Sequence, residues 1–535
     1  MALDTPKTLS RSTLAFLSGT MLSRITGLGR DVSMAVVFGS NPAVAAFMVA
    51  FRFANLIRRL FGEGPLSSGF IPHFEQMRAE SPEKGAAFFR DLFFSLSSFL
   101  ILLIGAIEGV LFAILKWGHL QPDNAQILYL TALMLPGVLF ICLFGLSSGL
   151  LQCERKFFLT GFAPVAFNLV WIFATFLLQG QDPAAAVLPL CFAIIVAFFL
   201  QWAMLAPRTL SHLRRHLPWK QCFSPRLFPL EMRQLLKPLL LGIIGVSAVQ
   251  INSTLDAVFA RYASLEGPAY LWYAIRIEQL PLALFGIALS AALLPPLARA
   301  LKSGIYTQYL HLLRFALRRS FSLIFPCSLG IFVLGIAGIN LLYGHGDFSS
   351  EATYQTVLCL WGYGLGLLPS SFVLLLAPAF YADKQFRTPM IGSVLSVLLN
   401  TLVTTLFVFG LGLGAFSIAI ATSCAAWFNF FYLAHHLSKK VGERVFDLGV
   451  LRAFIKTGGC SLIAAAATLL VGHFFVGDAT LLMALGKTQS CLTGSIQTQL
   501  LQFAALGGTF VLLFFSYAWL FNATDVLELV GAKRE

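Results

Sequence analysis

Long apolar runs separated by short polar loops fill this 535-residue chain from end to end. Each run is long enough to cross roughly 30 Å of hydrocarbon at about 1.5 Å rise per residue. The runs are continuous rather than alternating, which favours helices over the strands of a membrane β-barrel. The pattern therefore predicts an all-α polytopic membrane protein.

We predict fourteen spans, arranged as two six-helix lobes followed by two C-terminal helices. The division is an N-lobe at 1–205, a basic cytoplasmic linker at 206–233, a C-lobe at 234–436, and the last two helices with a cytoplasmic C-terminus at 437–535. The spans lie near residues 13–37, 43–65, 89–115, 127–151, 157–178, 184–205, 234–260, 268–298, 311–343, 353–381, 388–409, 413–436, 449–475 and 499–522.

Two pairs of similar sequence stretches, one member of each pair in either half of the chain, support duplicated lobes. LSSGFIP at 66–72 matches LSAALLP at 289–295, 223 residues later, and the turn from Lys156 to Asn168 resembles that from Gln385 to Asn400. Six spans is an even number, so the two halves have the same orientation, as in parallel-repeat transporters. Transport at their interface is the leading interpretation.

The basic residues are concentrated in alternate loops, which carry most of the net charge of +13. Because cytoplasmic loops are enriched in Lys and Arg, we expect both termini to face the cytoplasm and no nucleic-acid partner. The loop residues are Arg78, Lys84, Arg90, Arg155, Lys156, Arg208, Arg214, Arg215, Lys220, Arg226, Arg233, Arg299, Lys302, Lys384, Arg387, Lys439, Lys440 and Arg444.

Charged side chains also occur inside four predicted spans, where each costs roughly 2.5–3.5 kcal/mol at the bilayer centre. Helical spacing places Arg24 and Asp31 on nearly one face of span one, whereas the adjacent Arg30 points elsewhere. Span two carries Arg52, Asn55, Arg59 and Glu63 on one stripe with Arg58 beside it, span seven carries Asp256, and span eight carries Arg276 and Glu278.

Two interpretations of these charges are open. In the first, the charged side chains form salt bridges, as the i,i+4 spacing of Arg59 and Glu63 suggests, or the arginines extend to the membrane surface. Alternatively, the arginines bind an anionic ligand in a hydrated cavity, because their planar fork suits a carboxylate or phosphate. The excess of arginines over acids favours the second interpretation.

Motifs for chemistry are otherwise absent from the sequence. The nine cysteines form no CxxC pair, the histidines lack metal-site spacing, and there is no P-loop. We therefore expect no catalytic residue and no nucleotide hydrolysis. A transporter of this kind would use an ion gradient, the membrane potential or the gradient of its substrate.

The stretches Ser23–Asp31, Asn55–Phe61, Glu63–Gly64 and Phe70–Pro72 resemble the signature of the MurJ (MviN) family of lipid II flippases. Later stretches agree, including Tyr273–Ala274 with Arg276, Leu294–Pro295, Ala377–Pro378 and Thr388–Pro389. The resemblance covers nearly the whole chain and implies the fold of the multidrug/oligosaccharidyl-lipid/polysaccharide exporter superfamily.

The resemblance implies that the chain moves lipid II, the undecaprenyl-diphosphate-linked peptidoglycan precursor, to the outer leaflet of the bacterial cytoplasmic membrane. By motif position, Arg24, Arg30 and Arg276 would engage the diphosphate. Asp31 would orient Arg30, and Arg58 with Glu63 would form an important pair. Arg52, Asn55 and Arg59 would be accessory, and the last two spans would form a groove for the isoprenoid tail. Other membrane lipids and cell-wall synthesis or division proteins are possible partners.

The chain departs from the family pattern in two places, at Ala45–Phe47 and at Ile275, where many members carry acids. Without these acids the predicted cavity carries more positive charge than in those members. The coupling of transport to an ion therefore need not follow theirs. Some members bind Na⁺ through an acid that aligns with Asp256, and Asn400 could assist here; the membrane potential is the other candidate driving force. The alternatives are a multidrug or other anionic lipid-linked oligosaccharide exporter of the same superfamily, and a membrane transferase acting on the same lipid.

Overall fold

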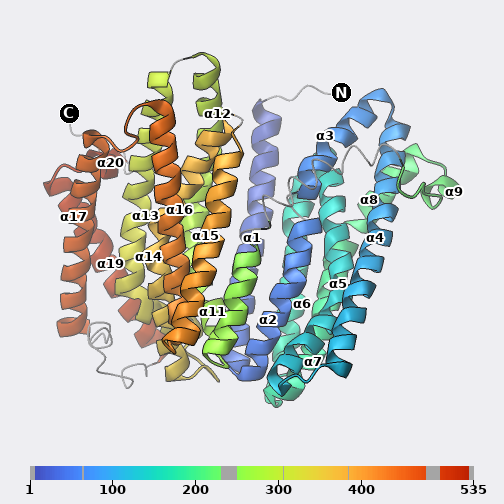
Figure 1. The fold of residues 1–535 in the computed structure, drawn as a ribbon, viewed down its shortest axis with the longest axis horizontal. Helices are drawn as coiled ribbons and strands as arrows, with labels where there is room; N and C mark the ends of the chain where they lie inside the picture. The colour runs from blue at the N-terminus through green and yellow to red at the C-terminus, as the bar shows by residue number, and fades with distance from the viewer. Residues whose placement is uncertain are drawn as a thin grey trace. The chain divides into compact units, whose positions relative to one another are not determined.

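The computed structural model describes residues 6–62, 65–229, 247, 250–304, 306–383, 385–476 and 495–528. Within these ranges the regular secondary structure is helical throughout, with no strand (Figure 1). The protein is therefore an all-helical one, as the sequence predicts.

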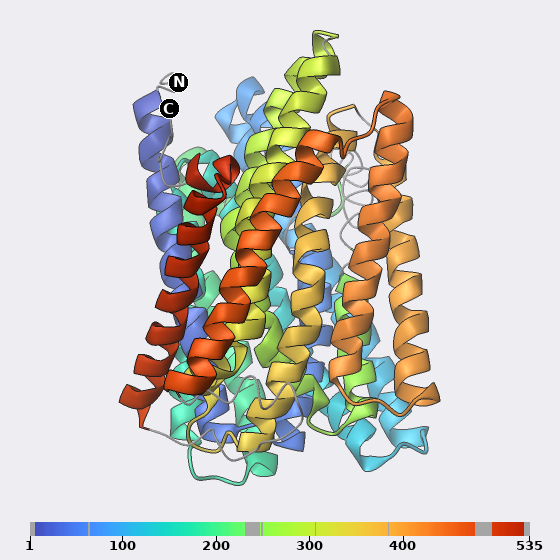
Figure 2. The ribbon, with the colours of Figure 1, turned by 90° about the vertical axis from the view of Figure 1, so that its left-hand side faces the viewer.

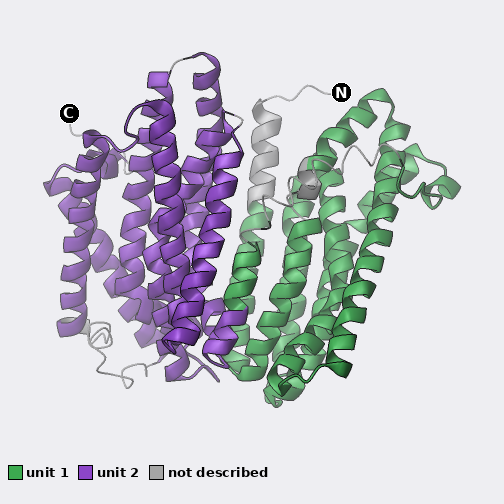
Figure 3. Ribbon diagram, viewed as in Figure 1, with its two compact units in different colours: residues 1–257 green, residues 258–535 purple. Residues whose placement is uncertain are grey.

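The chain divides into two compact units, residues 1–257 and 258–535 (Figure 3). The four-part division predicted from the sequence stays a prediction. Unit 1 contains α1 Pro6–Phe38, α2 Pro42–Phe61, α3 Pro65–Glu80, α4 Pro82–Trp117, α5 Pro122–Cys153, α6 Phe157–Leu177, α7 Pro183–Ala203, α8 Ala206–His216 and α9 Trp219–Cys222.

Unit 2 begins within a helical stretch at 250–263 and contains three π-helical segments, labelled η. Its elements are α11 Gly267–Pro281, η1 Leu282–Gly286, α12 Ile287–Lys302, α13 Tyr306–Tyr343, α14 Ser350–Tyr381, α15 Arg387–Thr405, η2 Leu406–Gly410, α16 Phe416–Val441, α17 Leu448–Val471, η3 Gly472–Val476, α19 Ile496–Leu520 and α20 Thr524–Leu527.

Eleven of the described helices are long and apolar enough to cross a membrane, which makes the chain a polytopic membrane protein. They coincide with predicted spans three to six and eight to fourteen. The first two predicted spans are the helices α1 and α2, whose arginines make them more polar than the others. Most of the predicted seventh span lies outside the described residues.

Proline and short polar residues set the helix starts. Pro42, Pro82 and Pro183 each occupy the first helical position, where the missing N–H costs nothing. The preceding residues Asn41, Ser81 and Asp182 accept hydrogen bonds from backbone N–H groups of the first turn. These signals explain why the helices begin where the sequence changes from loop to apolar run.

Small residues let the helices of unit 1 approach closely. A Cβ atom added to Gly145 of α5 would lie 1.7 Å from the carbonyl oxygen of Gly62, at the C-terminal end of α2. On α1, a Cβ atom at Gly19 would lie 2.9 Å from the backbone nitrogen of Phe162 on α6. Without a hydrophobic driving force in lipid, such close backbone contact supplies much of the helix–helix attraction.

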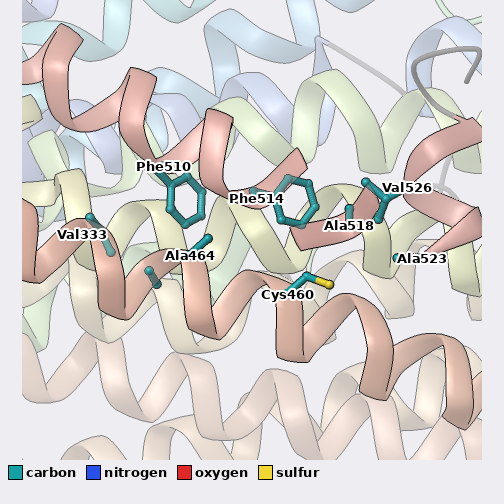
Figure 4. Close-up of a cluster of buried hydrophobic side chains, with 9 residues drawn as sticks. Val333, Cys460, Ala464, Phe510, Phe514, Ala518, Ala523 and Val526 are labelled. Carbon is teal, nitrogen blue, oxygen red and sulfur yellow. The ribbon is translucent and has the colours of Figure 1, made fainter. Parts of the chain in front are cut away.

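The last two long helices pack against the rest of unit 2 through a cluster of apolar side chains. Phe510 and Phe514 of α19 pack against Cys460 and Ala464 of α17, with Val333 of α13 alongside (Figure 4). Figure 2 shows α17 and α19 side by side at this end of the unit. The isoprenoid groove predicted for these helices stays a prediction.

Several of the charges assigned to cytoplasmic loops lie within helices, and one of them, Arg90, is also buried. Arg90 is inside α4 and only 7% exposed, where it donates to the adjacent Asp91 and to the backbone oxygen of Gln221 at 2.9 Å. A neighbouring carboxylate and a backbone carbonyl therefore replace water around this side chain, which a grouping by sequence position alone does not reveal.

Candidate functional site

The first candidate cluster is the pair formed by Arg30 and Asp31 on α1. Nε and Nη2 of Arg30 donate to Oδ1 of Asp31 at 3.0 and 2.8 Å. Both residues are buried, at 8% and 2% exposure. The expectation that Arg30 points away from Asp31 is wrong, because the long side chain folds back to reach the neighbouring carboxylate and so avoids an uncompensated charge in lipid.

Asn168 of α6 connects this pair to the rest of the motif. Its Oδ1 accepts a hydrogen bond from Nη1 of Arg30 at 3.2 Å, while its Nδ2 donates to the backbone oxygen of Ser23 at 3.0 Å and to Oγ1 of Thr26 at 3.1 Å. One buried amide therefore bonds to both ends of the segment from Ser23 to Arg30. The close approach of α1 and α6 at Gly19 brings it within reach.

The Arg30 guanidinium also lies 4.7 Å from the ring centroid of Trp171, one turn along α6 from Asn168. The indole is 1% exposed and packs edge-on against Phe51 of α2 and Phe167. A cation over an indole face gains up to about 2 kcal/mol when desolvated. Three kinds of contact therefore fix the position of this arginine.

Arg24, the other predicted arginine of α1, is exposed. It lies six residues before Arg30, so the two side chains leave the helix in different directions. Within the described part of the chain, its side chain makes no hydrogen bond or ion pair with the Asn168 cluster. Its predicted role rests on its position in the sequence motif.

The predicted stripe on α2 makes two separate contacts in unit 1. Nη1 of Arg52 donates to the side-chain and backbone oxygens of Ser253, at 2.7 and 3.1 Å. Nε of Arg58 donates to Oδ1 of Asn55 at 2.5 Å. Arg59 is exposed, and Glu63 lies outside the described residues.

In unit 2, Arg276 lies on α11 with its guanidinium 4.6 Å from the ring centroid of Trp272. These residues are four apart, so they stack on one face of the helix. The arrangement resembles that of Arg30 and Trp171, although here both partners come from one helix. In each unit an intramembrane arginine therefore lies over an indole.

The two residues proposed for sodium lie in different units. Asp256 is 6% exposed in unit 1 and accepts a hydrogen bond from Nδ2 of Asn252 at 3.3 Å, and Asn400 is 1% exposed on α15 of unit 2. Sodium would need several oxygen ligands, and these contacts provide one carboxylate that is already hydrogen-bonded. Among the residues placed by the structure, no three His, Cys, Asp or Glu side chains gather as a metal site.

The sequence analysis missed Trp171 and Trp272, and it noted Asn168 only as part of a similarity between the two halves of the chain. Trp272 could have been found from its i,i+4 spacing to Arg276. Trp171 and Asn168 lie 141 and 138 residues from Arg30, so only the packing of α1 on α6 identifies them as its partners.

Comparison with known proteins gives a consistent result. The family model described as lipid II flippase MurJ matches residues 34–485. A probable lipid II flippase MurJ of Chlamydia pneumoniae is 32% identical over 99% of this chain and 95% of its own length. The lipid II flippase MurJ of Burkholderia cenocepacia is 28% identical, over 85% of this chain and 89% of its own.

Solved structures show the same fold. A lipid II flippase MurJ in an inward closed conformation has a TM-score of 0.74 at 23% identity, covering 97% of this chain and all of that one. An inward-facing MATE-family multidrug transporter has a TM-score of 0.62 at 16% identity, covering 80% of this chain and 98% of its own. By the family match and the relatives of similar length, the chain belongs to the MurJ family of lipid II flippases, which are transporters rather than enzymes.

Proposed function

We propose that this protein moves lipid II from the inner to the outer leaflet of the bacterial cytoplasmic membrane by alternating access of two lobes. The observation that carries the proposal is the 32% identity over 99% of the chain to a probable lipid II flippase. Peptidoglycan synthesis then depends on it, because the precursor must be exposed at the outer surface before it is polymerised.

The arginines provide the chemistry for the head group. Arg24, Arg30 and Arg276 would bind the diphosphate, since guanidinium groups match phosphate oxygens in geometry and charge. The edge of Arg30 formed by Nε and Nη2 is occupied by Asp31. A diphosphate would therefore replace the Asp31 carboxylate on that edge or share Nη1 with Asn168, so that Asp31 keeps Arg30 positioned between transport cycles.

The remaining charges of α2 have a supporting role in this proposal. Arg58, held by Asn55, would act with Glu63 near the end of the helix, and Arg52 and Arg59 would add positive potential. We further propose the full set of fourteen spans with both termini in the cytoplasm, and a tail groove along α17 and α19. The apolar side chains Leu462, Leu470 and Leu512 are exposed on these helices and available to lipid.

The energy source in this proposal is the membrane potential or a cation gradient that resets the empty carrier. Sodium at Asp256 and Asn400 is one possibility, testable by calorimetric titration of the purified protein with NaCl against an Asp256→Asn variant. Equal sodium binding by both proteins would remove Asp256 from the site.

The proposed function is tested by exposure of lipid II at the outer surface of bacteria depleted of their own flippase. The parent should restore exposure, and Arg276→Ala should not, because the truncated side chain no longer attracts the diphosphate. Arg299→Ala is the matched control, since Arg299 is an exposed arginine in the last turn of the following helix α12. It should restore exposure like the parent.

Failure of a well-inserted parent to restore exposure would contradict the assignment of lipid II as substrate. Drug efflux without any effect on the cell wall would instead favour a multidrug exporter, the activity named for the MATE transporter of similar fold. Restored exposure by Arg276→Ala would leave the substrate in place and remove this arginine from the binding site.

A further inference from the structure

A buried acidic side chain, Glu278, lies in the first of the candidate membrane-crossing helices of unit 2, Gly267–Lys302. It is eleven residues beyond the first residue of α11 and 8% exposed. At about 1.5 Å per residue it lies roughly 16 Å along the helix, well inside a hydrocarbon layer of about 30 Å. Its burial is therefore within the membrane and not at a loop.

The face of α11 that carries Glu278 is a packed one. Leu271 and Ala274, seven and four residues earlier on the same stripe, are 1% and 0% exposed. Arg276 precedes Glu278 by two residues, so its side chain leaves the helix about 200° away on an ideal helix of 3.6 residues per turn. The arginine stacked on Trp272 and the carboxyl of Glu278 therefore point to opposite sides.

Two long helices, α13 and α14, pack against α11. Contacts made by α11 before and after Glu278 show which parts of these two helices lie beside it. Earlier on α11, the Tyr273 ring lies 4.9 Å from that of Tyr343 and 5.3 Å from that of Phe348. Beyond it, a Cβ atom at Gly286 would lie 3.4 Å from Oγ of Ser371.

No basic side chain lies at that level on these helices. Residues 352–371 of α14 include no Asp, Glu, Lys, Arg or His, and neither do residues 320–343 of α13 or the η1 segment. The charged residues of α13 come earlier, and two of them, Arg314 and Arg319, are bonded to the 443–447 loop and to the 525–528 segment. The other titratable residues of these segments and of α11 before Arg276 are Tyr270, Tyr273, Cys327, Tyr343, Tyr354, Cys359 and Tyr363.

Glu278 takes part in no hydrogen bond or ion pair with any other side chain that the structure places. An ionised carboxylate buried without a partner is so costly that such groups generally take up a proton and become neutral. A neutral carboxylic acid has a much smaller penalty. The surroundings of Glu278 therefore suit the protonated form, and a change that admits water would suit the ionised one.

The backbone next to Glu278 is irregular in a way that permits such a change. The π-helical segment η1 begins at Leu282, one turn after Glu278 and directly after Pro281. π-helical turns inside α-helices occur often at functional sites, and proline is a usual cause of helix bending. A shift of register here would rotate the preceding turn and move Glu278 relative to α14.

From this burial, isolation and adjoining π segment, we propose that Glu278 is a proton-binding site whose carboxyl is neutral in the packed state and ionised in another state of the cycle. The proton enters from one side of the membrane and leaves to the other, and no other bond is made or broken. Coupling of this proton to lipid movement rests on the proposed flippase function, whereas the binding site itself does not.

Infrared spectroscopy of the purified protein at neutral pH tests the site without requiring transport. A protonated carboxylic acid has a carbonyl stretch distinct from the bands of carboxylates, and we expect Glu278→Gln to remove one such band. Glu351→Gln is the matched control, because Glu351 is an exposed glutamate in the first turn of α14. It should leave the band unchanged. A spectrum of the parent without this band, or a band that survives Glu278→Gln, would overturn the proposal.

Transport in lipid II-loaded proteoliposomes tests the coupling. A pH gradient should change the parent's rate severalfold, and Glu278→Gln, which has the shape of the neutral form, should abolish that response. An equal response of parent and variant would overturn the coupling. Absence of lipid II movement by the parent under all conditions would count against the flippase function, and the infrared band would still decide the proton site.

Discussion

Two buried pairs of adjacent Arg and Asp residues in unit 1 have the same internal geometry and different surroundings. In Arg30–Asp31, Nε and Nη2 donate to Oδ1 at 3.0 and 2.8 Å, and in Arg90–Asp91 the same atoms do so at 2.8 and 2.6 Å. Arg30 then contacts the side chains of Asn168 and Trp171. The second pair instead contacts backbone groups.

The backbone contacts of the second pair come from the segment after α8. Arg90 donates to the oxygen of Gln221, Oδ1 of Asp91 accepts from the nitrogen of Arg226 at 2.9 Å, and Oγ of Ser95 accepts from the nitrogen of Phe228 at 2.9 Å. These hydrogen bonds hold the basic segment from Gln221 to Phe228 against α4. The same dipeptide therefore holds a loop segment in place in one case and joins a cluster of side chains from α6 in the other.

The largest expected effect is that of Asp91→Ala on stability. Removing one partner of a buried ion pair costs about 3–5 kcal/mol, because the remaining charge is left without compensation. We expect a large drop in the thermal midpoint of the detergent-solubilised protein. The exposed Asp347→Ala should stay within about 0.5 kcal/mol of the parent. A variant at Asp91 as stable as the parent would show that the pair holds nothing in place.

Asn168→Ala should affect both stability and transport. The substitution leaves the buried Arg30 donor and the Ser23 carbonyl without this partner, at a cost of about 1–3 kcal/mol. Because Arg30 loses its positioning, lipid II exposure per folded molecule should fall about tenfold if about 1.4 kcal/mol of that cost is expressed in transport. Asn168→Asp, which keeps the acceptor oxygen, should retain more activity than the alanine variant. Normal exposure by Asn168→Ala would separate the cluster from transport.

Trp171→Phe should have a smaller effect. A phenyl ring keeps most of the packing with Phe51 but attracts the guanidinium less, a difference of up to about 1–2 kcal/mol. Lipid II binding by the purified protein should weaken accordingly. Trp202→Phe, in an aromatic cluster with Phe93 and Phe140 on the same unit, is the control and should bind normally. Equal weakening in both variants would point to packing alone.

The smallest effect is expected from Ser95→Ala. It removes one hydrogen bond to the nitrogen of Phe228, worth about 0.5–1.5 kcal/mol. Amide hydrogen exchange at Phe228 should accelerate while that of α4 stays unchanged. Ser97→Ala, which removes a bond to the backbone of α4 itself, should not affect Phe228. Unchanged exchange at Phe228 would show that this hydrogen bond does not hold the basic segment on α4.

The sequence predicts the helices well because backbone groups in lipid must bond within their own segment. It also selects Arg30 and Arg276 as candidates, since charges are conspicuous within apolar runs, and their role in binding stays a prediction. It does not identify Asn168 and Trp171 as partners of Arg30, because they come from a helix more than a hundred residues away. It places Arg90 in a loop, because a count of charges does not reveal that Asp91 and Gln221 surround that side chain.

Lysine substitution measures the difference between the two pairs most directly, because lysine keeps the charge and removes the planar fork. Arg30→Lys and Arg90→Lys are compared for thermal midpoint and for lipid II exposure per folded molecule. We expect Arg30→Lys to lose most of its specific transport with a smaller change in midpoint. Arg90→Lys should lose stability and keep the specific transport of the parent. Full transport by Arg30→Lys, or equal loss of transport in both variants, would contradict the claim that Arg30 engages the substrate.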